Sequence, residues 1–366
     1  MQRIMVMVGT RPEAIKLCPL IRELKRRGRF EVQVCSTGQH RVMLDSALEA
    51  FAVKPDFDFD VMRTGQTLSD VQARIMRRTD EILRAERPAM VLVQGDTTTA
   101  FATSLSAFYN RIPVGHVEAG LRTYHMDSPF PEEFHRTAIS LCASYHFAPT
   151  VTAKKNLVKE GVRESSVFIT GNTVVDALRY TLTECQARYP FCVPKGARLL
   201  VFTAHRRESF GKPIRGILRA LKTMVDTYPD VIAICPLHHN PEVRRAASEI
   251  LKDHPRIHLV EPPEIVAFHH LLAGAYMIVT DSGGIQEEAV ALGIPTLVTR
   301  FSTERSEGLR TGVLRLAGSS EEGIADLGVR LLAPDSEEYL SMKKPSKIYG
   351  DGNASVRIAN VLERVL

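Results

Sequence analysis

The chain has 366 residues, of which 44% are hydrophobic and 24% are charged, a composition typical of a soluble globular protein with two domains. It carries 47 basic and 42 acidic residues, a net charge of +5, without a long basic run. This mild excess does not favour nucleic acid as a partner, and an anionic small molecule is enough to explain it.

No segment approaches the roughly 20 apolar residues that a membrane helix needs, and the opening apolar run is too short for a signal peptide. The six cysteines stand at positions 18, 35, 142, 185, 192 and 235 and form no CxxC pair. This spacing indicates reduced, buried thiols and neither a disulfide framework nor a zinc site. We therefore expect a cytoplasmic protein with no membrane partner.

In the first half of the chain, short apolar runs alternate with helical patterns. Strands are expected at residues 3–8, 32–35, 90–93, 114–116, 145–147 and 167–169. Helices are expected at residues 14–25, 43–51, 68–84, 97–109, 134–142 and 153–160. Thr10 and Glu13 have capping-box spacing at the start of the first helix. The alternation predicts a doubly wound parallel sheet, whose ligands lie beyond the carboxyl ends of the strands.

A similar series begins after a stretch rich in Pro and Gly, so we expect a linker somewhere within residues 172–196. Further strands are expected at residues 199–203, 231–235, 257–260, 276–279 and 296–298. The predicted domains are residues 1–171 and 172–352, each an α/β unit. Residues 353–366 are amphipathic and are expected to form a helix packed on the body.

The stretch from Asp281 to Glu288 (DSGGIQEE) has the pattern of a strand end, a glycine turn and a helix start. Ser282, Gly283 and Gly284 would let free backbone N–H groups point at a phosphate. Glu288, within the first helical turns, is placed to reach a ribose hydroxyl. The alternative is a glycine-rich connection that binds no ligand.

Carboxylates and cations also follow several of the expected strands. If carboxylates shared a cleft, their repulsion would raise at least one pKa, so that one acts as acid and another as base. The carboxylates are Asp96, Glu118 and Glu132, and the cations suited to a diphosphate are Arg11, Lys16, His205 and Arg206 or Arg207. The alternative is that these residues cap helices or form surface ion pairs.

The sequence does not favour metal or dinucleotide chemistry. The His238-His239 and His269-His270 pairs lack the spacing of a helical metal site, so no metal is expected. Neither the G-x-G-x-x-G nor the Walker pattern occurs.

Six motifs in order resemble those of one enzyme family. They are GTRPEAIK at residues 9–16, GDTTT at 95–99, GHVEAGLRT at 115–123, TGNT at 170–173, HRRES at 205–209 and TDSGGIQEEA at 280–289. The chain resembles the bacterial, non-hydrolysing UDP-N-acetylglucosamine 2-epimerases, nearly end to end. This resemblance implies the GT-B fold, in which two Rossmann-like domains flank a cleft.

The resemblance implies reversible conversion of UDP-GlcNAc to UDP-ManNAc for surface polysaccharide synthesis, without a cofactor, in a homodimer. UDP would leave by anti elimination, giving 2-acetamidoglucal, and return after C2 is reprotonated on its other face. The implied acid/base residues are Asp96, Glu118 and Glu132; which serves which face stays open. Diphosphate contacts are implied for Arg11, Lys16, His205, Arg206, Ser282, Gly283 and Gly284, and a ribose contact for Glu288.

Alternatives with the same motifs are a hydrolysing UDP-sugar 2-epimerase and an epimerase of a related UDP-acetamido sugar. A GT-B glycosyltransferase and a non-catalytic nucleotide-sugar sensor are more distant rivals. The intact carboxylates argue against a sensor.

The chain also departs from the family pattern. Relatives often have an allosteric UDP-GlcNAc site, for which Gln39, His40, Gln66 and His238 are candidates here. Val42 stands where a second glutamine is usual, and valine cannot hydrogen-bond, which puts allosteric control in doubt. His135 replaces a common asparagine, and Ala204 a glycine.

Overall fold

A computed structural model describes residues 1–38, 41–63, 65–186, 193–204, 206 and 211–366. These residues form two compact units. Unit 1 comprises Met1–Tyr180 with Tyr349–Leu366, and unit 2 comprises Thr181–Ile348. The boundaries expected from the sequence, after residues 171 and 352, lie near these points but not at them.

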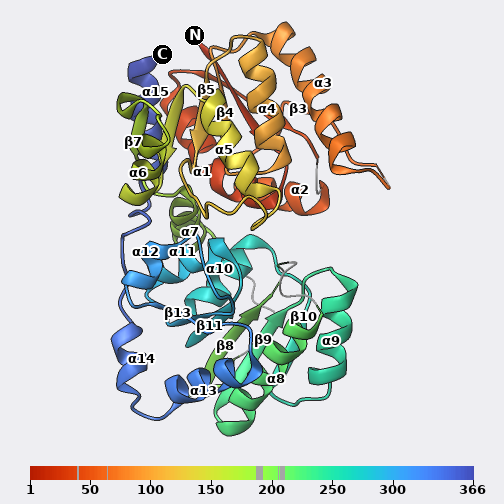
Figure 1. The fold of residues 1–366 in the computed structure, drawn as a ribbon, viewed down its shortest axis with the longest axis vertical. Coiled ribbons are helices and arrows are strands. Elements are labelled where there is room, and N and C mark those ends of the chain that lie inside the picture. Colours follow the sequence, from red (N-terminus) through yellow and green to blue (C-terminus); the bar gives the residue numbers. More distant parts are fainter. Residues whose placement is uncertain (39–40, 64, 187–192, 205, 207–210) are drawn as a thin grey trace. The chain divides into compact units, whose positions relative to one another are not determined.

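Unit 1 is built on a seven-stranded parallel sheet in the order β3-β2-β1-β4-β5-β6-β7 (Figure 1). The strands are β1 (Arg3–Val8), β2 (Glu31–Ser36), β3 (Phe57–Asp58), β4 (Met90–Gln94), β5 (Val114–Val117), β6 (Tyr145–Ala148) and β7 (Val167–Ile169). The helices are α1 (Arg11–Arg27), α2 (Arg41–Ala50), α3 (Leu68–Glu86), α4 (Thr98–Tyr109), α5 (Glu132–Cys142), α6 (Val151–Lys159), a short 3₁₀ turn (Glu164–Ser166) and α7 (Thr173–Glu184).

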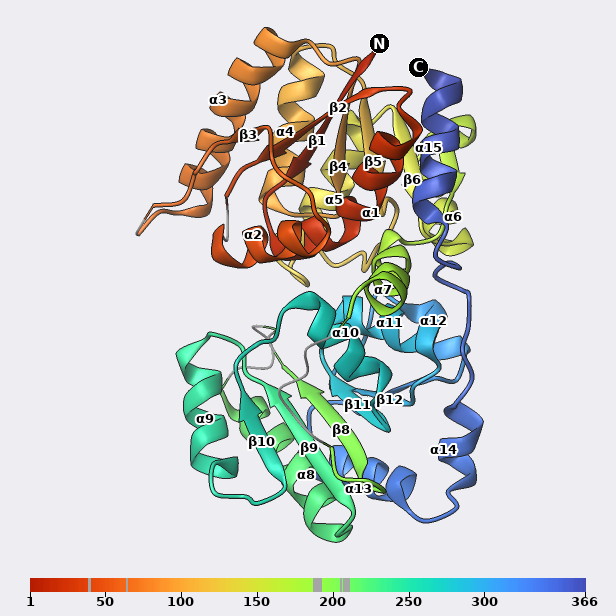
Figure 2. The same cartoon turned by 180° about the vertical axis from the view of Figure 1, so that it is seen from behind.

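Helices cover both faces of this sheet. Figures 1 and 2 show α3, α4 and α5 on one face and α1 and α2 on the other. Since both faces are covered, the inner strands are continuous apolar runs, and every residue from Ile4 to Val8 in β1 is fully buried. The predicted capping box of Thr10 and Glu13 is present and starts α1 two residues after the end of β1. Sequence order reverses at β1, so the carboxyl ends of β1, β4 and β5 form the expected ligand edge.

Unit 2 repeats this plan with a six-stranded parallel sheet in the order β10-β9-β8-β11-β12-β13. The strands are β8 (Arg198–Thr203), β9 (Val231–Pro236), β10 (Ile257–Val260), β11 (Met277–Thr280), β12 (Thr296–Val298) and β13 (Leu314–Leu316). The helices are α8 (Lys212–Thr227), α9 (Pro241–Leu251), α10 (Ile265–Ala273), α11 (Gly283–Leu292), α12 (Ser306–Arg310), α13 (Glu321–Leu332) and α14 (Glu337–Met342). The predicted pair of doubly wound, Rossmann-like sheets is therefore confirmed.

The last helix, α15 (Ala354–Val365), belongs to unit 1 and packs against α1 (Figure 2). Arg27 of α1 donates a 2.7 Å hydrogen bond to Asn360. The carboxylate of Asp176 accepts hydrogen bonds from the backbone N–H groups of Ala354 and Ser355, at 3.1 and 2.7 Å. Asp176 thus caps the start of α15, because these N–H groups have no partner within the helix.

The structure differs from the sequence-based expectation in several elements. Helix α7 (Thr173–Glu184) was not expected; it lies within residues 172–196, where a linker was expected somewhere, and leaves the residues after Glu184 for that linker. The edge strands β3 and β13 were not expected. Helices α10, α12, α13 and α14 were not expected either.

In the ranges that the structure describes, no helix is both long and apolar enough to cross a membrane. Cys18, Cys35 and Cys235 are buried free thiols, and Cys142 and Cys185 are half-buried free thiols. Cys192 lies outside the described residues.

Candidate functional site

Glu118 follows β5 directly, at the ligand edge of unit 1. Its two carboxylate oxygens accept hydrogen bonds from Lys16 Nζ at 2.7 and 2.8 Å. Asn172 Nδ2 donates to Oε1 at 2.8 Å, and Gln94 Nε2 donates to Oε2. Only 4% of the Glu118 side chain is exposed, so Lys16 balances a buried negative charge.

The backbone at Glu118 has a φ of +66°, in the left-handed region. Non-glycine residues adopt this conformation at a cost, and such residues concentrate at functional sites. The contacts from Lys16, Asn172 and Gln94 hold the side chain that this backbone presents.

The loop after β1 is fixed to the loop after β4 through Glu13. Glu13 accepts hydrogen bonds from the backbone N–H groups of Gly9 and Thr10 at 3.0 and 2.7 Å, and from Thr97 Oγ1 at 2.6 Å. Burial raises the pKa of Glu13 to about 7, although these hydrogen bonds act in the opposite direction. A Cβ atom at Gly9 would lie 2.0 Å from Thr99 Oγ1, so this close approach requires glycine.

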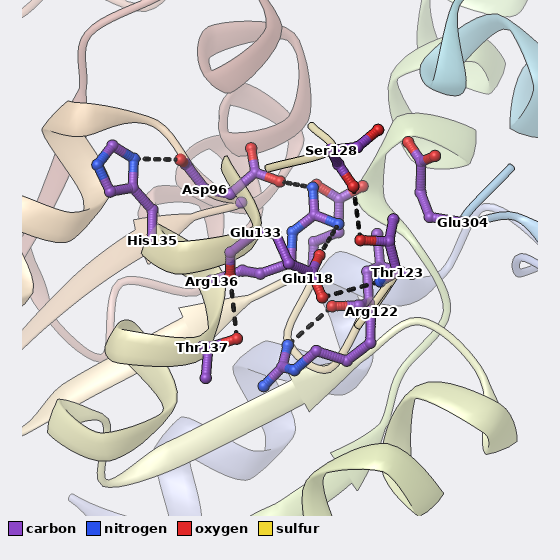
Figure 3. A network of polar contacts seen from close by, with 12 residues as sticks. Asp96, Glu118, Arg122, Thr123, Ser128, Glu133, His135, Arg136, Thr137 and Glu304 are labelled. Atoms are coloured by element: carbon purple, nitrogen blue, oxygen red, sulfur yellow. Dashed lines mark hydrogen bonds and ion pairs between the residues drawn. The ribbon is translucent and has the colours of Figure 1, made fainter. Parts of the chain in front are cut away.

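Asp96 follows Gly95 at the end of β4, and its side chain forms an ion pair with Arg136 of α5 (Figure 3). Arg136 also pairs with Glu133 at 3.1 Å. Glu133 in turn accepts hydrogen bonds from the backbone N–H groups of Thr123 and Tyr124 at 2.9 and 2.8 Å. The first turns of α5 therefore hold both Asp96 and the loop that follows Glu118.

His135 lies beside this network (Figure 3). Its Nδ1 is 2.9 Å from the carbonyl oxygen of Asp96, and its ring stacks on Phe101 with centroids 5.0 Å apart. His135 therefore holds the backbone of Asp96.

Glu132 is the first residue of α5, where the helix dipole favours a negative charge. Its Oε2 is buried and has no hydrogen-bond partner among the described residues. Arg136 lies one turn further along the same face of α5. One helix thus carries Glu132 and the arginine that pairs with Asp96.

In unit 2, Asp281 follows β11 and is fully buried. Its Oδ2 accepts a 3.0 Å hydrogen bond from the backbone N–H of Arg206, and its carbonyl accepts one from Arg206 Nε at 3.1 Å. These contacts join the loops after β8 and β11, at the point where the order of the second sheet reverses.

Helix α11 begins at Gly283, with Ser282 as its N-cap residue and no side-chain cap. The first N–H groups of the helix are therefore available to an anion. A Cβ atom at Gly283 would lie 2.8 Å from Arg305 Cζ, whereas one at Gly284 would meet nothing within 4 Å. Gly283 thus lets the Arg305 guanidinium lie against the start of α11, and Gly284 leaves open space.

A cluster of buried charges surrounds Glu304 in the same unit. Glu304 accepts hydrogen bonds from Arg206 at 3.0 Å, from Arg300 at 3.0 Å and from Arg305. Arg305 also pairs with Glu287 at 2.9 Å. Burial alone would raise the pKa of Glu304, but Arg305, Arg206 and Arg300 together hold it well below its usual range.

Glu288 lies on α11 and is 5% exposed. Its Oε1 is 3.3 Å from Nε2 of His269, and its Oε2 is buried without a hydrogen-bond partner in the described part of the chain. Oε2 of Glu288 can therefore accept a hydrogen bond from a ligand.

The other predicted site residues lie in different elements or outside the described residues. Arg11 is the first residue of α1 and is half-buried. Gln66 Oε1 accepts hydrogen bonds from the Arg63 backbone at 3.0 Å and from Arg74 at 2.9 Å. His238 is exposed beyond β9. His205, Gln39 and His40 lie outside the described residues.

The sequence reasoning assigned no role to several residues that contact the predicted ones. Asn172 lies in TGNT, Arg136 stands four residues after Glu132, and Gln94 is the last residue of β4. Helical spacing would have indicated Arg136, but the contacts of Gln94 and Asn172 follow only from the strand order.

Two Rossmann-like sheets with these polar edges define an α/β protein of the GT-B class. Residues 22–363 match the sequence model of the family described as UDP-N-acetylglucosamine 2-epimerase. The chain therefore belongs to the UDP-N-acetylglucosamine 2-epimerase family, and the resemblance found in the sequence is confirmed.

Individual relatives are similar over nearly the whole chain. UDP-N-acetylglucosamine 2-epimerase from Bacillus subtilis (strain 168) is 47% identical over 98% of this chain and 94% of its own length. The protein of the same name from Escherichia coli (strain K12) is 46% identical, over 99% of this chain and 98% of its own. The crystal structure of UDP-GlcNAc 2-epimerase from Neisseria meningitidis bound to UDP-GlcNAc is 41% identical, with a TM-score of 0.95 and full coverage of both chains.

Proposed function

We propose that this protein interconverts UDP-GlcNAc and UDP-ManNAc by inverting C2 of the sugar. The observation that carries this proposal is the 47% identity, over 98% of the chain, to a relative named as this epimerase. Within unit 1, buried carboxylates at the ligand edge suit acid/base chemistry, and within unit 2 an uncapped helix start suits a phosphate group.

The C2 hydrogen of the sugar is not adjacent to a carbonyl group, so direct removal as a proton is difficult. Departure of UDP from C1 develops positive charge there and acidifies the C2 hydrogen. A base takes this proton, which leaves 2-acetamidoglucal and UDP. Proton return to the other face of C2 and re-addition of UDP give the epimer, with no net oxidation. The protein must hold both fragments and keep water away from C1.

The three candidate carboxylates have different surroundings, which suggests different roles. Glu118 already accepts hydrogen bonds from Lys16, Asn172 and Gln94. We infer that Glu118 chiefly holds the Lys16 ammonium, which would stabilise departing UDP.

Glu132 has a buried oxygen without a partner in the described residues, and Asp96 has a side chain that is 27% exposed. We infer that these two exchange protons at C2, because each has an oxygen atom that can accept a proton without breaking the Glu118–Lys16 pair.

The diphosphate would lie at the start of α11, against the backbone of Ser282, Gly283 and Gly284. Arg11, on α1 of unit 1, and His205, outside the described residues, stay predicted diphosphate contacts. The Arg206 guanidinium is already held by Glu304 and Asp281, so a direct contact with the diphosphate would need that arrangement to change. Glu288 would accept a hydrogen bond from the ribose.

Proton exchange with solvent tests this proposal directly. Incubating UDP-GlcNAc with the protein in D₂O should place deuterium at C2 and produce UDP-ManNAc, both followed by NMR. Release of free sugar with UDP would instead support a hydrolysing enzyme, and no exchange at C2 would contradict the proposal.

We also propose that the protein is a homodimer. Exposed apolar side chains gather on the packed helices α4 and α5, namely Phe108, Tyr109, Phe134 and Leu141. Large exposed apolar side chains concentrated on neighbouring helices are typical of an interface. Light scattering should give a dimer mass for the native protein and a monomer mass for Leu141→Glu. Leu340→Glu, at an exposed leucine of α14, is the matched control and should stay dimeric.

A cytoplasmic location and a role in surface polysaccharide synthesis stay predictions. The free thiols of Cys18, Cys35 and Cys235 suit a reducing compartment.

A further inference from the structure

Glu288 has one carboxylate oxygen fixed and one left over. His269 Nε2 lies 3.3 Å from Oε1, while Oε2 is buried and has no hydrogen-bond partner among the described residues. A buried carboxylate oxygen without a donor is costly. The unused oxygen of Glu288 therefore indicates a ligand group that donates a hydrogen bond, such as a hydroxyl.

His269 of α10 is fully buried and is held at both ring nitrogens. Its Nδ1 lies 2.6 Å from Oγ1 of Thr181, a fully buried residue of α7 in the same unit. A carboxylate can only accept hydrogen bonds, so the hydrogen between His269 and Glu288 must be on Nε2. With Nε2 as the donor, Nδ1 of the neutral ring accepts from the Thr181 hydroxyl.

We propose that His269 is a positioning residue, which holds Glu288 so that its second oxygen accepts a hydrogen bond from a ribose hydroxyl. This inference rests on the proposed function, in which Glu288 binds ribose. Thr181 fixes the ring of His269, and His269 fixes one oxygen of Glu288. The other oxygen then needs no further ordering when the nucleotide binds, which favours ribose over deoxyribose.

Binding of nucleoside diphosphates to the full-length protein, by calorimetry, tests this chain of contacts. The probes are UDP, 2′-deoxy-UDP and 3′-deoxy-UDP. The native protein should bind UDP at least about tenfold more tightly than one of the deoxy probes, because the analogue leaves the Glu288 oxygen unpaired. His269→Ala should remove most of this preference by weakening UDP binding about tenfold while affecting the deoxy probe little.

Two milder variants probe the same contacts without a large cavity. His269→Gln carries an amide N–H that reaches the Nε2 position and should restore part of the preference. Thr181→Val removes the hydroxyl with little change in shape and should reduce the preference less than His269→Ala does. In turnover, all three variants should raise KM more than they lower kcat.

The matched control is Tyr339→Phe. The Tyr339 hydroxyl donates a 3.0 Å hydrogen bond to the carbonyl of Tyr276, within unit 2. Losing this buried hydrogen bond should leave the ratio of UDP to deoxy-UDP affinity unchanged, because neither residue contacts Glu288 or His269 in the described contacts.

The outcomes separate the inference from the proposed function. If Glu288→Gln reduces the preference while His269→Ala, His269→Gln and Thr181→Val all keep it, His269 does not position Glu288, although the epimerase proposal stands. If the native protein shows no preference and Glu288→Gln changes nothing, Glu288 does not bind ribose and this inference fails with that assignment. The D₂O exchange experiment reports on the epimerase activity independently of both.

Discussion

At the scale of single residues, the carboxylates of Glu118 and Glu132 have different surroundings. Glu118 accepts hydrogen bonds at both oxygens, while Oε2 of Glu132 has no partner in the described part of the structure. The same substitution at each position should therefore have different effects on folding, even though both side chains are proposed to act in the reaction.

Asp96→Asn, Glu118→Gln and Glu132→Gln should each lower kcat about 100-fold or more, since each removes a charged group from the proposed reaction site. Their affinity for UDP, measured by calorimetry, should fall far less. Glu164→Gln, at an exposed residue, is the control. Near-native turnover in all three site variants would contradict the proposed roles.

Glu118→Gln should also lower the free energy of unfolding by about 3–5 kcal/mol, because it leaves the buried Lys16 ammonium without its carboxylate. Glu132→Gln should cost much less. Denaturant unfolding of both variants checks this difference. Equal losses of unfolding free energy would show that pairing with Lys16 gives Glu118 no larger role in stability than Glu132 has.

Site residues that belong to a recognisable motif could be predicted from the sequence. Site residues that only the folded chain brings together could not. The motifs predict Asp96, Glu118 and Lys16 as site residues, and Lys16 and Glu118 are in contact. Gln94 and Asn172 contact Glu118 from distant parts of the sequence, which no spacing rule could indicate.

At the scale of elements, the two glycines that begin α11 have different surroundings. A Cβ atom at Gly283 would collide with the Arg305 guanidinium, whereas one at Gly284 would enter open space. Gly283→Ala should therefore destabilise the protein by about 1–3 kcal/mol, a shift of a few degrees in Tm. Gly284→Ala is the matched substitution and should leave Tm unchanged or slightly raised. Thermal unfolding checks both, and equal Tm values would mean that Arg305 moves aside without cost.

The elements that were predicted correctly have strong local signals. The capping box of Thr10 and Glu13 marks the start of α1, and the buried apolar residues of β1 precede it. The edge strand β3 has only 2 residues, and in β13 the charged Arg315 separates the two apolar residues, so neither gives a recognisable apolar run; each pairs with one neighbouring strand. Helix α7 was missed because the Pro- and Gly-rich residues after it suggested a linker.

At the scale of the whole molecule, two buried histidines make stability depend on pH. His116 and His146 are partners on β5 and β6, and burial lowers their pKa values to about 3 and about 4. The unfolded chain binds these protons near pH 6.5, so the unfolded state takes up more protons below that pH. The contribution of these two histidines to stability should thus be full above pH 6.5 and fall as the pH drops towards about 4.

Each of the two histidines should contribute up to about 1.4 kcal/mol per pH unit within this window. Glu13 acts with the opposite sign: its raised pKa, about 7, costs stability as the pH rises from 4.5. The measurement is denaturant unfolding between pH 4 and pH 8. His146→Gln should flatten the acid side of the curve, and an unchanged slope would show that His146 is not the titrating group.

The fold class followed from the alternation of strands and helices, since only a parallel sheet accommodates it. Two units were also expected, from the Pro- and Gly-rich stretch between two alternating series, but no local pattern indicated that the last residues, Tyr349–Leu366, belong to the first unit. Their place in that unit depends on α15 packing against α1, a contact between the two ends of the chain.

The contact between α1 and α15 determines which of the two units can fold completely first during synthesis on the ribosome. Unit 2 is one uninterrupted segment, Thr181–Ile348, whereas unit 1 needs the last residues, Tyr349–Leu366. Synthesis runs from the N-terminus, so the later-made unit can reach its native form while the earlier-made one still waits for its final helix. A nascent chain stalled before Tyr349 would therefore expose the face of α1 that α15 covers in the finished protein.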